Sequence, residues 1–354
     1  MIRKYYTILL KSLMCIFEYV KVQIYLLIIK NRSVLMGIPW HGNIGDQAIV
    51  VGEEFVLKNI YENNKIIKIS YNTLIIIMKF HLPNFILRKE DILFLHGGGN
   101  LGTLYINEEI VRRYIIETYK NNKIIIMPIS IFFHNNEKGN SELIKSIKCY
   151  SNHADLTIIT RDKNSYSIAK KYFIKNNIKL LPDIVNVLDV DFLNIQNVIP
   201  KYDVVLFLRK DIEKVLSTEA IILLLEKINE NNLNYLLTDT IENVNIYSDS
   251  ERLKYIVSKI KLAAESKIVI TDRFHGMIFS IITHTPVIVF KSYDSKITYG
   301  VKWFANLDYV YYMENFNIEN IIKIIDKNVV NKNNVTQVNN CKNILLEGLN
   351  KILK

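Results

Sequence analysis

The sequence has few cysteines and no long apolar run, and each absence excludes a class of protein. Its three cysteines, Cys15, Cys149 and Cys341, are far apart, and only Cys149 has a candidate co-ligand nearby, His153. This spacing matches neither a zinc motif nor a disulfide framework, so we expect a protein of the reducing cytosol. No uninterrupted apolar stretch reaches the ~18 residues of a membrane-spanning helix, and no signal-peptide cleavage site follows a short apolar core.

Basic residues outnumber acidic ones in this chain. Lys and Arg total 45 against 35 Asp and Glu, which gives a formal net charge of +10 over 354 residues. The lysines are scattered through Lys-, Asn- and Ile-rich sequence, and the chain has neither a nucleic-acid module nor a cluster of interleaved basic and aromatic residues. The charge therefore indicates an anionic small molecule or an anionic membrane surface as partner, and no nucleic acid.

Residues 1–30 form a basic amphipathic segment. Lys4, Lys11, Glu18 and Lys21 interrupt its apolar residues at roughly helical spacing. Such a helix can pack on the body of the protein or lie in the interfacial region of a membrane. The sequence leaves both interpretations open, and the second would hold the protein at the inner face of the plasma membrane.

From Ser33 onward, short apolar runs alternate with helix-length amphipathic segments, which is typical of parallel sheets covered by helices on both faces. We predict an α/β protein with two Rossmann-like domains. Residues 183–201 show no clear period, and Pro200 precedes a new strand, so we place the linker there. The predicted parts are a segment 1–30, a first domain 31–195, a second domain 200–335 and a C-terminal helix 336–354.

The apolar runs define the predicted elements. The strands of the first domain are expected at 34–39, 66–70, 92–96, 123–130, 156–160 and 179–181. Those of the second are expected at 204–208, 234–237, 267–270 and 287–290, with helices near 218–229, 250–264 and 318–326. Residues 337–353 also have helical spacing, and we expect this helix to cross back onto the first domain.

The segment 271–290 carries the strongest functional signal. A predicted strand ends before Asp272, Arg273 and His275, and an apolar helix begins near Gly276. In parallel sheets ligands bind at the carboxyl ends of the strands, where helix N-termini add partial positive charge. Arg offers a planar fork to a carboxylate or phosphate, and His can move a proton near neutral pH. We predict an anion- and proton-handling site here, and a structural role for His284 at the end of the helix.

A first glycine-containing turn, HGNIGDQAI at residues 41–49, follows the first predicted strand. Asn43 and Asp46 can cap the next helix, and the backbone amides of the turn can receive an oxyanion. An ordinary strand-to-helix turn would need the same glycines for its backbone conformation. The pattern alone leaves both interpretations open.

A second glycine-rich turn, LHGGGNLG at residues 95–102, follows a nearly continuous apolar strand. It formally matches a dinucleotide fingerprint, but it does not open the first unit, and the next predicted strand ends without the acid that would bind a ribose. We therefore reject a dinucleotide site and expect a loop at which Gly98, Gly99 and Asn100 let a substrate approach the backbone. His96 is either a contact residue or a structural histidine beneath the loop.

Charged residues end three other predicted strands. Arg161 precedes a helix that begins at Asp162, and Asp183 closes the first domain in the short motif LPD. Arg161 is either the partner of a nearby carboxylate or a cleft residue that contacts phosphate or sugar. Arg209 and Lys210 end the first strand of the second domain, where they are either solvated charges or part of a cationic pocket beside Asp272 to Gly276.

Together these motifs resemble the polysaccharide pyruvyl transferase family. The resemblance rests on the order and spacing of GNIGD, LHGGGNLG, RD before Ser165, LPD, and DRFHG with its trailing TPVIVF and Lys291, and it runs from about Gly37 to Lys291. It implies a GT-B-like pair of α/β domains, the first on the acceptor side and the second on the donor side, with the active site in the cleft between them. The implied reaction transfers pyruvate from phosphoenolpyruvate to a sugar of a cell-surface polysaccharide or of its lipid-linked precursor, and forms a pyruvate ketal.

The resemblance also assigns residues, because it associates the Arg and His of the motif D-R-x-H-G with donor binding and catalysis. We expect His275 to act as general acid or base and Asp272 to orient it. No metal or cofactor is expected besides phosphoenolpyruvate as co-substrate, since cationic side chains and helix ends can neutralise the donor. The predicted donor-binding residues are Arg273, Arg209, Lys210, Gly276 and Lys291, and the predicted acceptor or cleft residues are Asn43, Asp46, Gly98, Gly99, Asn100, Arg161 and Asp183.

Two other functions stay open at this stage. A GT-B glycosyltransferase that uses a nucleotide sugar would need the same cleft and the same basic groups. A membrane-associated scaffold or binding protein of polysaccharide assembly would keep the fold without turnover.

Overall fold

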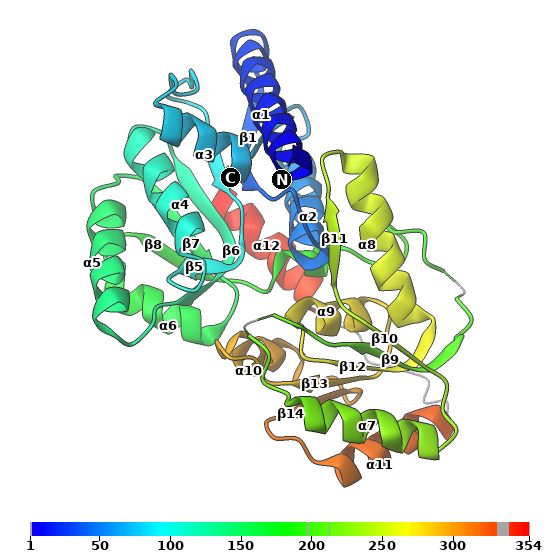
Figure 1. Ribbon diagram of the computed structural model, residues 1–354. Coiled ribbons are helices and arrows are strands. Elements are labelled where there is room, and N and C mark those ends of the chain that lie inside the picture. Colours follow the sequence, from blue (N-terminus) through cyan, green and yellow to red (C-terminus); the bar gives the residue numbers. More distant parts are fainter. Residues whose placement is uncertain (1, 197, 212, 331–339, 354) are drawn as a thin grey trace. The chain divides into compact units, whose positions relative to one another are not determined.

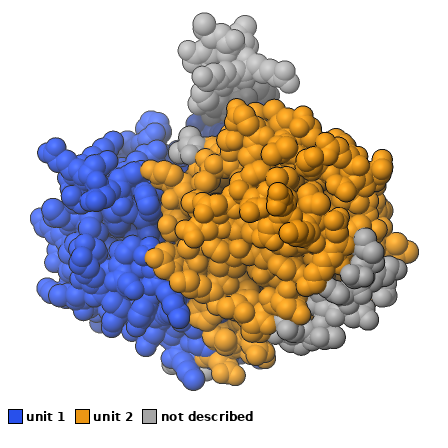
Figure 2. Space-filling model, turned by 90° about the horizontal axis from the view of Figure 1, so that it is seen from below, with its two compact units in different colours: residues 1–40, 53–184, 348–354 blue, residues 41–52, 185–347 orange. Residues whose placement is uncertain are grey.

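The computed structural model describes residues 2–196, 198–211, 213–330 and 340–353. The chain divides into two compact units (Figure 2). Unit 1 consists of residues 1–40, 53–184 and 348–354, and unit 2 of residues 41–52 and 185–347. Each unit is built on a parallel sheet with helices, so the predicted α/β class is confirmed.

Unit 1 contains a parallel sheet whose strands follow the order β3-β1-β4-β6-β7-β8, with β5 paired to β6 (Figure 1). The strands are β1 (Arg32–Ile38), β3 (Lys65–Ser70), β4 (Leu93–Leu95), β5 (Gly98–Gly102), β6 (Ile124–Phe132), β7 (Leu156–Thr160) and β8 (Asn177–Leu180). The helices are α1 (Ile2–Ile28), α3 (Tyr71–Phe80), α4 (Ile106–Thr118), α5 (Glu137–Ser151) and α6 (Lys163–Tyr172).

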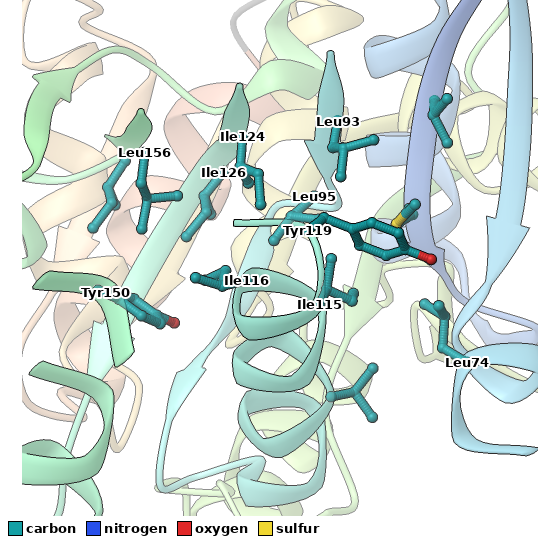
Figure 3. Packing of buried hydrophobic residues seen from close by; sticks show 14 of the residues in the cluster. Leu74, Leu93, Leu95, Ile115, Ile116, Tyr119, Ile124, Ile126, Tyr150 and Leu156 are labelled. Carbon is teal, nitrogen blue, oxygen red and sulfur yellow. The ribbon is translucent and has the colours of Figure 1, made fainter. Parts of the chain in front are cut away.

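The core of unit 1 lies between this sheet and its helices. Figure 3 shows Ile115 and Ile116 of α4 facing the strand residues Leu95, Ile124 and Ile126, all of which belong to one buried cluster. Because its strands are nearly continuous in Ile, Val and Leu, the sheet is apolar on both faces and must be covered on both. These runs explain why the strands of this unit were readable from the sequence.

Unit 2 contains a parallel sheet in the order β10-β9-β12-β13-β14 and a short antiparallel pair of β2 with β11. The strands are β2 (His41–Asn43), β9 (Tyr202–Phe207), β10 (Tyr235–Thr238), β11 (Ile241–Asn245), β12 (Ser266–Thr271), β13 (Val287–Phe290) and β14 (Val310–Met313). The helices are α7 (Thr218–Glu230), α8 (Asp249–Ala264), α9 (Phe274–Ile282), α10 (Lys296–Gly300) and α11 (Ile318–Val330), with the 3-10 turn η2 (Val301–Phe304). The helix α12 (Cys341–Leu353) and the 3-10 turn η1 (Ile184–Val187) contain residues of both units. The helix α2 (Ile44–Ile60) contains the boundary between the units.

The division into units differs from the contiguous domains expected above. Residues 41–52, assigned by sequence to the first domain, belong to unit 2, and residues 348–354 belong to unit 1. The physical reason is the pairing of β2 with β11, in which the backbone at Gly42 approaches the carbonyl of Glu242 so closely that a side chain has no room. Pairing between segments so distant along the chain has no signal in local periodicity.

The turn at 95–102 also differs from its prediction. It is not a loop, because Gly98–Gly102 form the strand β5, and Gly98 and Gly102 have positive φ values of 107° and 114° that residues with a side chain rarely adopt. The short strands β2, β11 and β14 were not predicted either. Among the described residues, no helix has the length and apolar character to cross a membrane.

Candidate functional site

The candidate site of unit 2 lies at the carboxyl ends of three adjacent parallel strands. The strands β10, β9 and β12 are neighbours in the sheet, and Thr271 at the end of β12 pairs with Phe207 at the end of β9. The segments that follow these strands therefore meet at one edge. There the carboxylate of Asp272 accepts a hydrogen bond of 2.9 Å from the backbone N–H of Arg209. The prediction of a cationic pocket required the ends of β9 and β12 to be neighbours, and they are.

The motif DRFHG forms the start of α9, and the motif GNIGD forms the start of α2. The α2 turn is held by Asn43, whose side chain accepts from the N–H of Gly45 at 3.2 Å and donates to Asp46 at 2.8 Å. The N–H of Ile44 donates to the carbonyl of Thr240 at 3.0 Å. These bonds hold the N-terminus of α2 within unit 2.

The two helix N-termini meet at His275. Its imidazole packs so closely on Gly45 that a Cβ added to this glycine would overlap the ring. His275 is 8% exposed, and its ring also makes an edge-on contact with Phe274, with centroids 5.5 Å apart. Since both helices direct partial positive charge to their N-termini, this meeting point favours a negatively charged group. Gly45, the second glycine of GNIGD, thus leaves room for the imidazole of His275, and the sequence could not reveal this requirement.

Arg273 is held by two carboxylates. Its Nε and one terminal nitrogen donate to the two oxygens of Asp239, each at 2.7 Å, and its other terminal nitrogen donates to Asp211 at 2.6 Å. Burial alone would lower the pKa of Arg273, but the two carboxylates raise it. Three of the five N–H groups of the guanidinium are used in this way, and the other two have no hydrogen-bond partner among the described residues.

A second cluster of charges surrounds Arg209. This guanidinium pairs with the buried carboxylate of Glu213, and its Nε lies 3.1 Å from Asp211 without hydrogen-bond geometry. Lys296 binds Glu213 at 2.6 Å and lies 3.2 Å from Asp294. Together with Arg273 and Asp239, three cations thus face four carboxylates. These ion pairs hold the side chains in fixed positions, and the carboxylates cancel the positive charge of the three cations.

Asp272 differs from these paired carboxylates. It is 1% exposed, and one oxygen accepts from Arg209 while Oδ2 has no hydrogen-bond partner in the part of the chain that the structure describes. Burial raises its pKa from 3.8 to about 6, and the hydrogen bond and positive charge of Arg209 oppose this shift. This carboxyl group can therefore gain or lose a proton close to neutral pH.

The remaining predicted residues of this region have distinct environments. Gly276 has no space for a side chain, because a Cβ would overlap the hydroxyl of Thr271. Lys210 is exposed and Lys291 half-buried, and within the described residues neither side chain makes an ion pair. His284 is exposed at the end of α9 with a positive φ of 55°, a helix-terminating conformation that agrees with the predicted structural role.

The predicted residues of the second glycine turn belong to unit 1. Gly98, Gly99 and Asn100 lie in β5, and the Asn100 side chain accepts from Arg112 at 2.6 Å and donates to Glu108. Asn100 is therefore held by two residues of α4. A separate contact gives His96 a structural partner, since its Nδ1 lies 2.8 Å from Glu53. This contact agrees with the interpretation of His96 as a structural histidine beneath the turn.

Arg161 and Asp183 form an ion pair inside unit 1. Their closest atoms are 2.6 Å apart, the side chains are 2% and 1% exposed, and Arg161 also donates to the hydroxyl of Ser130 at 2.8 Å. Asp162 caps α6 by accepting from the N–H of Ser165 at 2.8 Å. The structure thus pairs Arg161 with a carboxylate, the first of the two interpretations above, and gives both residues a role in the packing of the strand ends.

Sequence reasoning missed the four carboxylates of the unit 2 network: Asp211, Glu213, Asp239 and Asp294. A signal existed for Asp239, because it follows the predicted strand 234–237 and so lies at the same edge as Asp272. Asp211 is two residues beyond Arg209 and was open to the same argument. Lys296 and Glu213 are 83 residues apart, and only the fold brings them together. Among the described residues, no group of three or more His, Cys, Asp and Glu side chains is arranged to hold a metal ion.

The chain is similar to several known proteins. A family model described as "Polysaccharide pyruvyl transferase" matches residues 43–295. General stress protein 30 of Bacillus subtilis is 33% identical over 301 residues, which cover 84% of this chain and 85% of that protein. Pyruvyl transferase 1 of Schizosaccharomyces pombe is 29% identical over 283 residues, covering 76% of this chain and 68% of that protein. A solved UDP-GlcNAc 2-epimerase from Neisseria meningitidis, 12% identical, aligns with a TM-score of 0.50 over 91% of this chain and 100% of that one. The fold is thus GT-B-like.

Proposed function

Because this chain belongs to the polysaccharide pyruvyl transferase family, we propose that it is an enzyme that transfers pyruvate from phosphoenolpyruvate to a sugar. The acceptor in this proposal is a sugar of a cell-surface polysaccharide or of its lipid-linked precursor, and the product is a pyruvate ketal. The observation that carries the proposal is the meeting of the two family motifs at His275 and Gly45. A proton-transferring group lies there at the N-termini of α2 and α9.

The charges of unit 2 support an anionic donor in a specific way. The carboxylates of the network already neutralise Arg209, Arg273 and Lys296. The carboxylate and phosphate of phosphoenolpyruvate are then compensated by the two helix N-termini, by the two remaining N–H groups of Arg273, and by Lys210 and Lys291. In this proposal Asp211 and Asp239 orient Arg273 toward the donor, as rigid supports of a binding group.

The proposed reaction has three proton movements. His275 or Asp272 delivers a proton to the methylene carbon of the enol, which creates a cationic centre at the adjacent carbon. One sugar hydroxyl attacks that carbon and loses its proton, the C–O bond to phosphate breaks, and a second hydroxyl of the same sugar closes the ketal with loss of its proton. One of the released protons replaces the one used, and the other leaves with the phosphate. The raised pKa of Asp272 gives the site one group that exchanges a proton near neutral pH, and His275 is the second proton carrier in this proposal.

Purified protein, phosphoenolpyruvate and a panel of free, nucleotide-linked and lipid-linked sugars test this function. We expect phosphate release that depends on the acceptor, and a product whose mass exceeds that of the acceptor by pyruvate less one water. His275→Asn should abolish turnover, whereas the control His284→Asn, at the exposed end of the same helix, should leave it unchanged. Turnover that survives in His275→Asn contradicts the site, and the absence of any pyruvylated product across the panel contradicts the function.

Thermal unfolding separates the proposed donor from a nucleotide sugar. A ligand that binds only the folded protein raises the unfolding temperature with its concentration. We expect protection by phosphoenolpyruvate and none by uridine or guanosine diphosphate. Protection by a nucleoside diphosphate alone would favour a GT-B glycosyltransferase.

A further inference from the structure

One face of the helix α1 is anchored to unit 1. Its residues Cys15, Val22 and Leu26 are 2–3% exposed, and Val22 and Leu26 belong to the buried cluster of that unit. Glu18 accepts hydrogen bonds from the N–H of Ser70 at 2.9 Å and from the Ser70 hydroxyl. The helix lies beside α3 and β3 (Figure 1). α1 is thus part of the folded body of unit 1.

The opposite face of α1 is apolar and exposed. Over residues 9–28 its side chains repeat at three- and four-residue spacing, so they form one stripe along the helix. In a surface helix this stripe would ordinarily be polar. The exposed fractions are Leu9 57%, Leu10 42%, Leu13 54%, Ile16 48%, Phe17 71%, Val20 48%, Ile24 47%, Leu27 61% and Ile28 70%. We call these nine residues the outer stripe.

A neighbouring segment extends this face. The side chain of Gln23 accepts from the N–H of Ile86 at 3.3 Å, and Ile86 is 60% exposed. Arg88 donates to the carbonyl of Lys30 at 3.4 Å. An apolar side chain and a guanidinium from outside the helix thus lie next to the outer stripe and the end of α1. Contiguous exposed apolar surface of this kind marks an interaction site.

Over residues 9–30 the exposed charged side chains are all basic. Residues 1–30 contain five basic residues and a single acidic one, Glu18. Glu18 is turned to the core side, where Ser70 holds it, and burial raises its pKa. Lys21 is exposed, and Lys30 at the end of the segment is exposed as well. The solvent side of α1 thus combines an apolar stripe with positive charge and carries no exposed carboxylate over residues 9–30.

We propose that the outer stripe, Ile86 and the flanking cations dock unit 1 on an anionic phospholipid bilayer, with α1 lying parallel to the surface at the level of the head groups. An apolar face bordered by lysines is what this environment selects, because acyl chains receive the apolar residues while anionic head groups attract the cations. A second copy of this chain is the less suitable occupant. It would bring the same lysines and the same excess of positive charge against each other.

Vesicle co-sedimentation of the full-length protein tests this docking. We expect binding to vesicles of phosphatidylcholine with phosphatidylglycerol, weak binding to phosphatidylcholine alone, and release as salt is raised. Phe17→Glu should lower the partition coefficient at least tenfold, because it places a charge in the centre of the stripe. Lys21→Gln and Lys30→Gln should each lower it about fivefold on the anionic vesicles only.

Matched controls distinguish the stripe from general surface effects. Ile174 is 76% exposed in unit 1 outside α1, so Ile174→Glu should leave vesicle binding unchanged. Lys58, whose side chain is 68% exposed, provides the control Lys58→Gln. Circular dichroism confirms that each variant is folded, and sedimentation velocity measures self-association. Equal binding of Phe17→Glu and the wild-type protein overturns the proposal. The proposal is also overturned if the wild-type protein does not bind anionic vesicles, whether it remains monomeric or forms a dimer that Phe17→Glu disrupts.

Discussion

The buried carboxyl group of Asp272 makes a prediction that can be worked through in numbers. Its pKa is raised by burial from 3.8 to about 6. A raised folded-state pKa means that the folded protein binds the proton more tightly than the unfolded chain does. The stabilising contribution is therefore fully present below pH 3.8 and is lost as the pH rises through about 6. At about 1.4 kcal/mol for each pH unit, the whole effect is about 3 kcal/mol.

The substitution Asp272→Asn removes this titration and keeps the size of the side chain. We expect the free energy of unfolding of the wild-type protein to rise, relative to the variant, by about 1.4 kcal/mol between pH 8 and pH 5. The rest of the gain should appear below pH 5. Any pH-independent change in stability that the new amide introduces shifts the free energy of unfolding of the variant equally at every pH. The test therefore rests on how the difference between wild type and variant changes with pH, and not on the size of that difference at one pH.

Urea denaturation monitored by tryptophan fluorescence measures this pH dependence of the free energy of unfolding in unit 2. The chain has two tryptophans, Trp40 in unit 1 and Trp303 in unit 2. In a Trp40→Phe background, Trp303 therefore reports on the unit that contains Asp272.

The control is Asp203 on β9. Burial would raise its pKa, but hydrogen bonds from Lys267 and Asn234 lower it. Asp203→Asn should then produce the opposite slope, because a lowered pKa stabilises the folded state at high pH and loses this effect as the pH falls. A constant difference between wild type and Asp272→Asn from pH 8 to pH 5 would refute the reasoning.

Two other substitutions test the packing of the motifs. Gly45→Ala should displace the imidazole of His275, since an added Cβ overlaps it. We expect turnover to fall at least tenfold with little change in secondary structure. Unchanged steady-state rates would count against the site. Arg161→Met should lower the free energy of unfolding by about 3–5 kcal/mol, because it removes the guanidinium that forms an ion pair with the buried carboxylate of Asp183. Adding Asp183→Leu should recover part of this loss. Urea denaturation monitored by the fluorescence of Trp40, in a Trp303→Phe background, measures the stability of both variants. A double variant no more stable than Arg161→Met would contradict the pairing argument.

Much of the fold was predictable because its signals are local. The strand at 124–132 is almost entirely Ile, Met, Pro and Phe, and the strand ending at Thr271 is followed by an apolar helix, so both were readable from short windows. The short strands β2, β11 and β14 were missed, since none of them contains a run of Ile, Val and Leu. The turn at 98–102 was mistaken for a loop because its glycines mask a strand that pairs with β6.

The sequence by itself determined the α/β class, the positions of the main strands and helices, and the place of DRFHG on a strand-to-helix turn. These follow from hydrophobic periodicity and turn residues within a few positions of each other. Only the tertiary structure decided that GNIGD belongs with unit 2 and packs on His275, and that Asp211 and Asp239 hold Arg273. The order of strands in a sheet sets which of their ends are neighbours, and no local pattern records that order. The contact between Gly45 and His275 likewise joins residues that are 230 positions apart in the sequence.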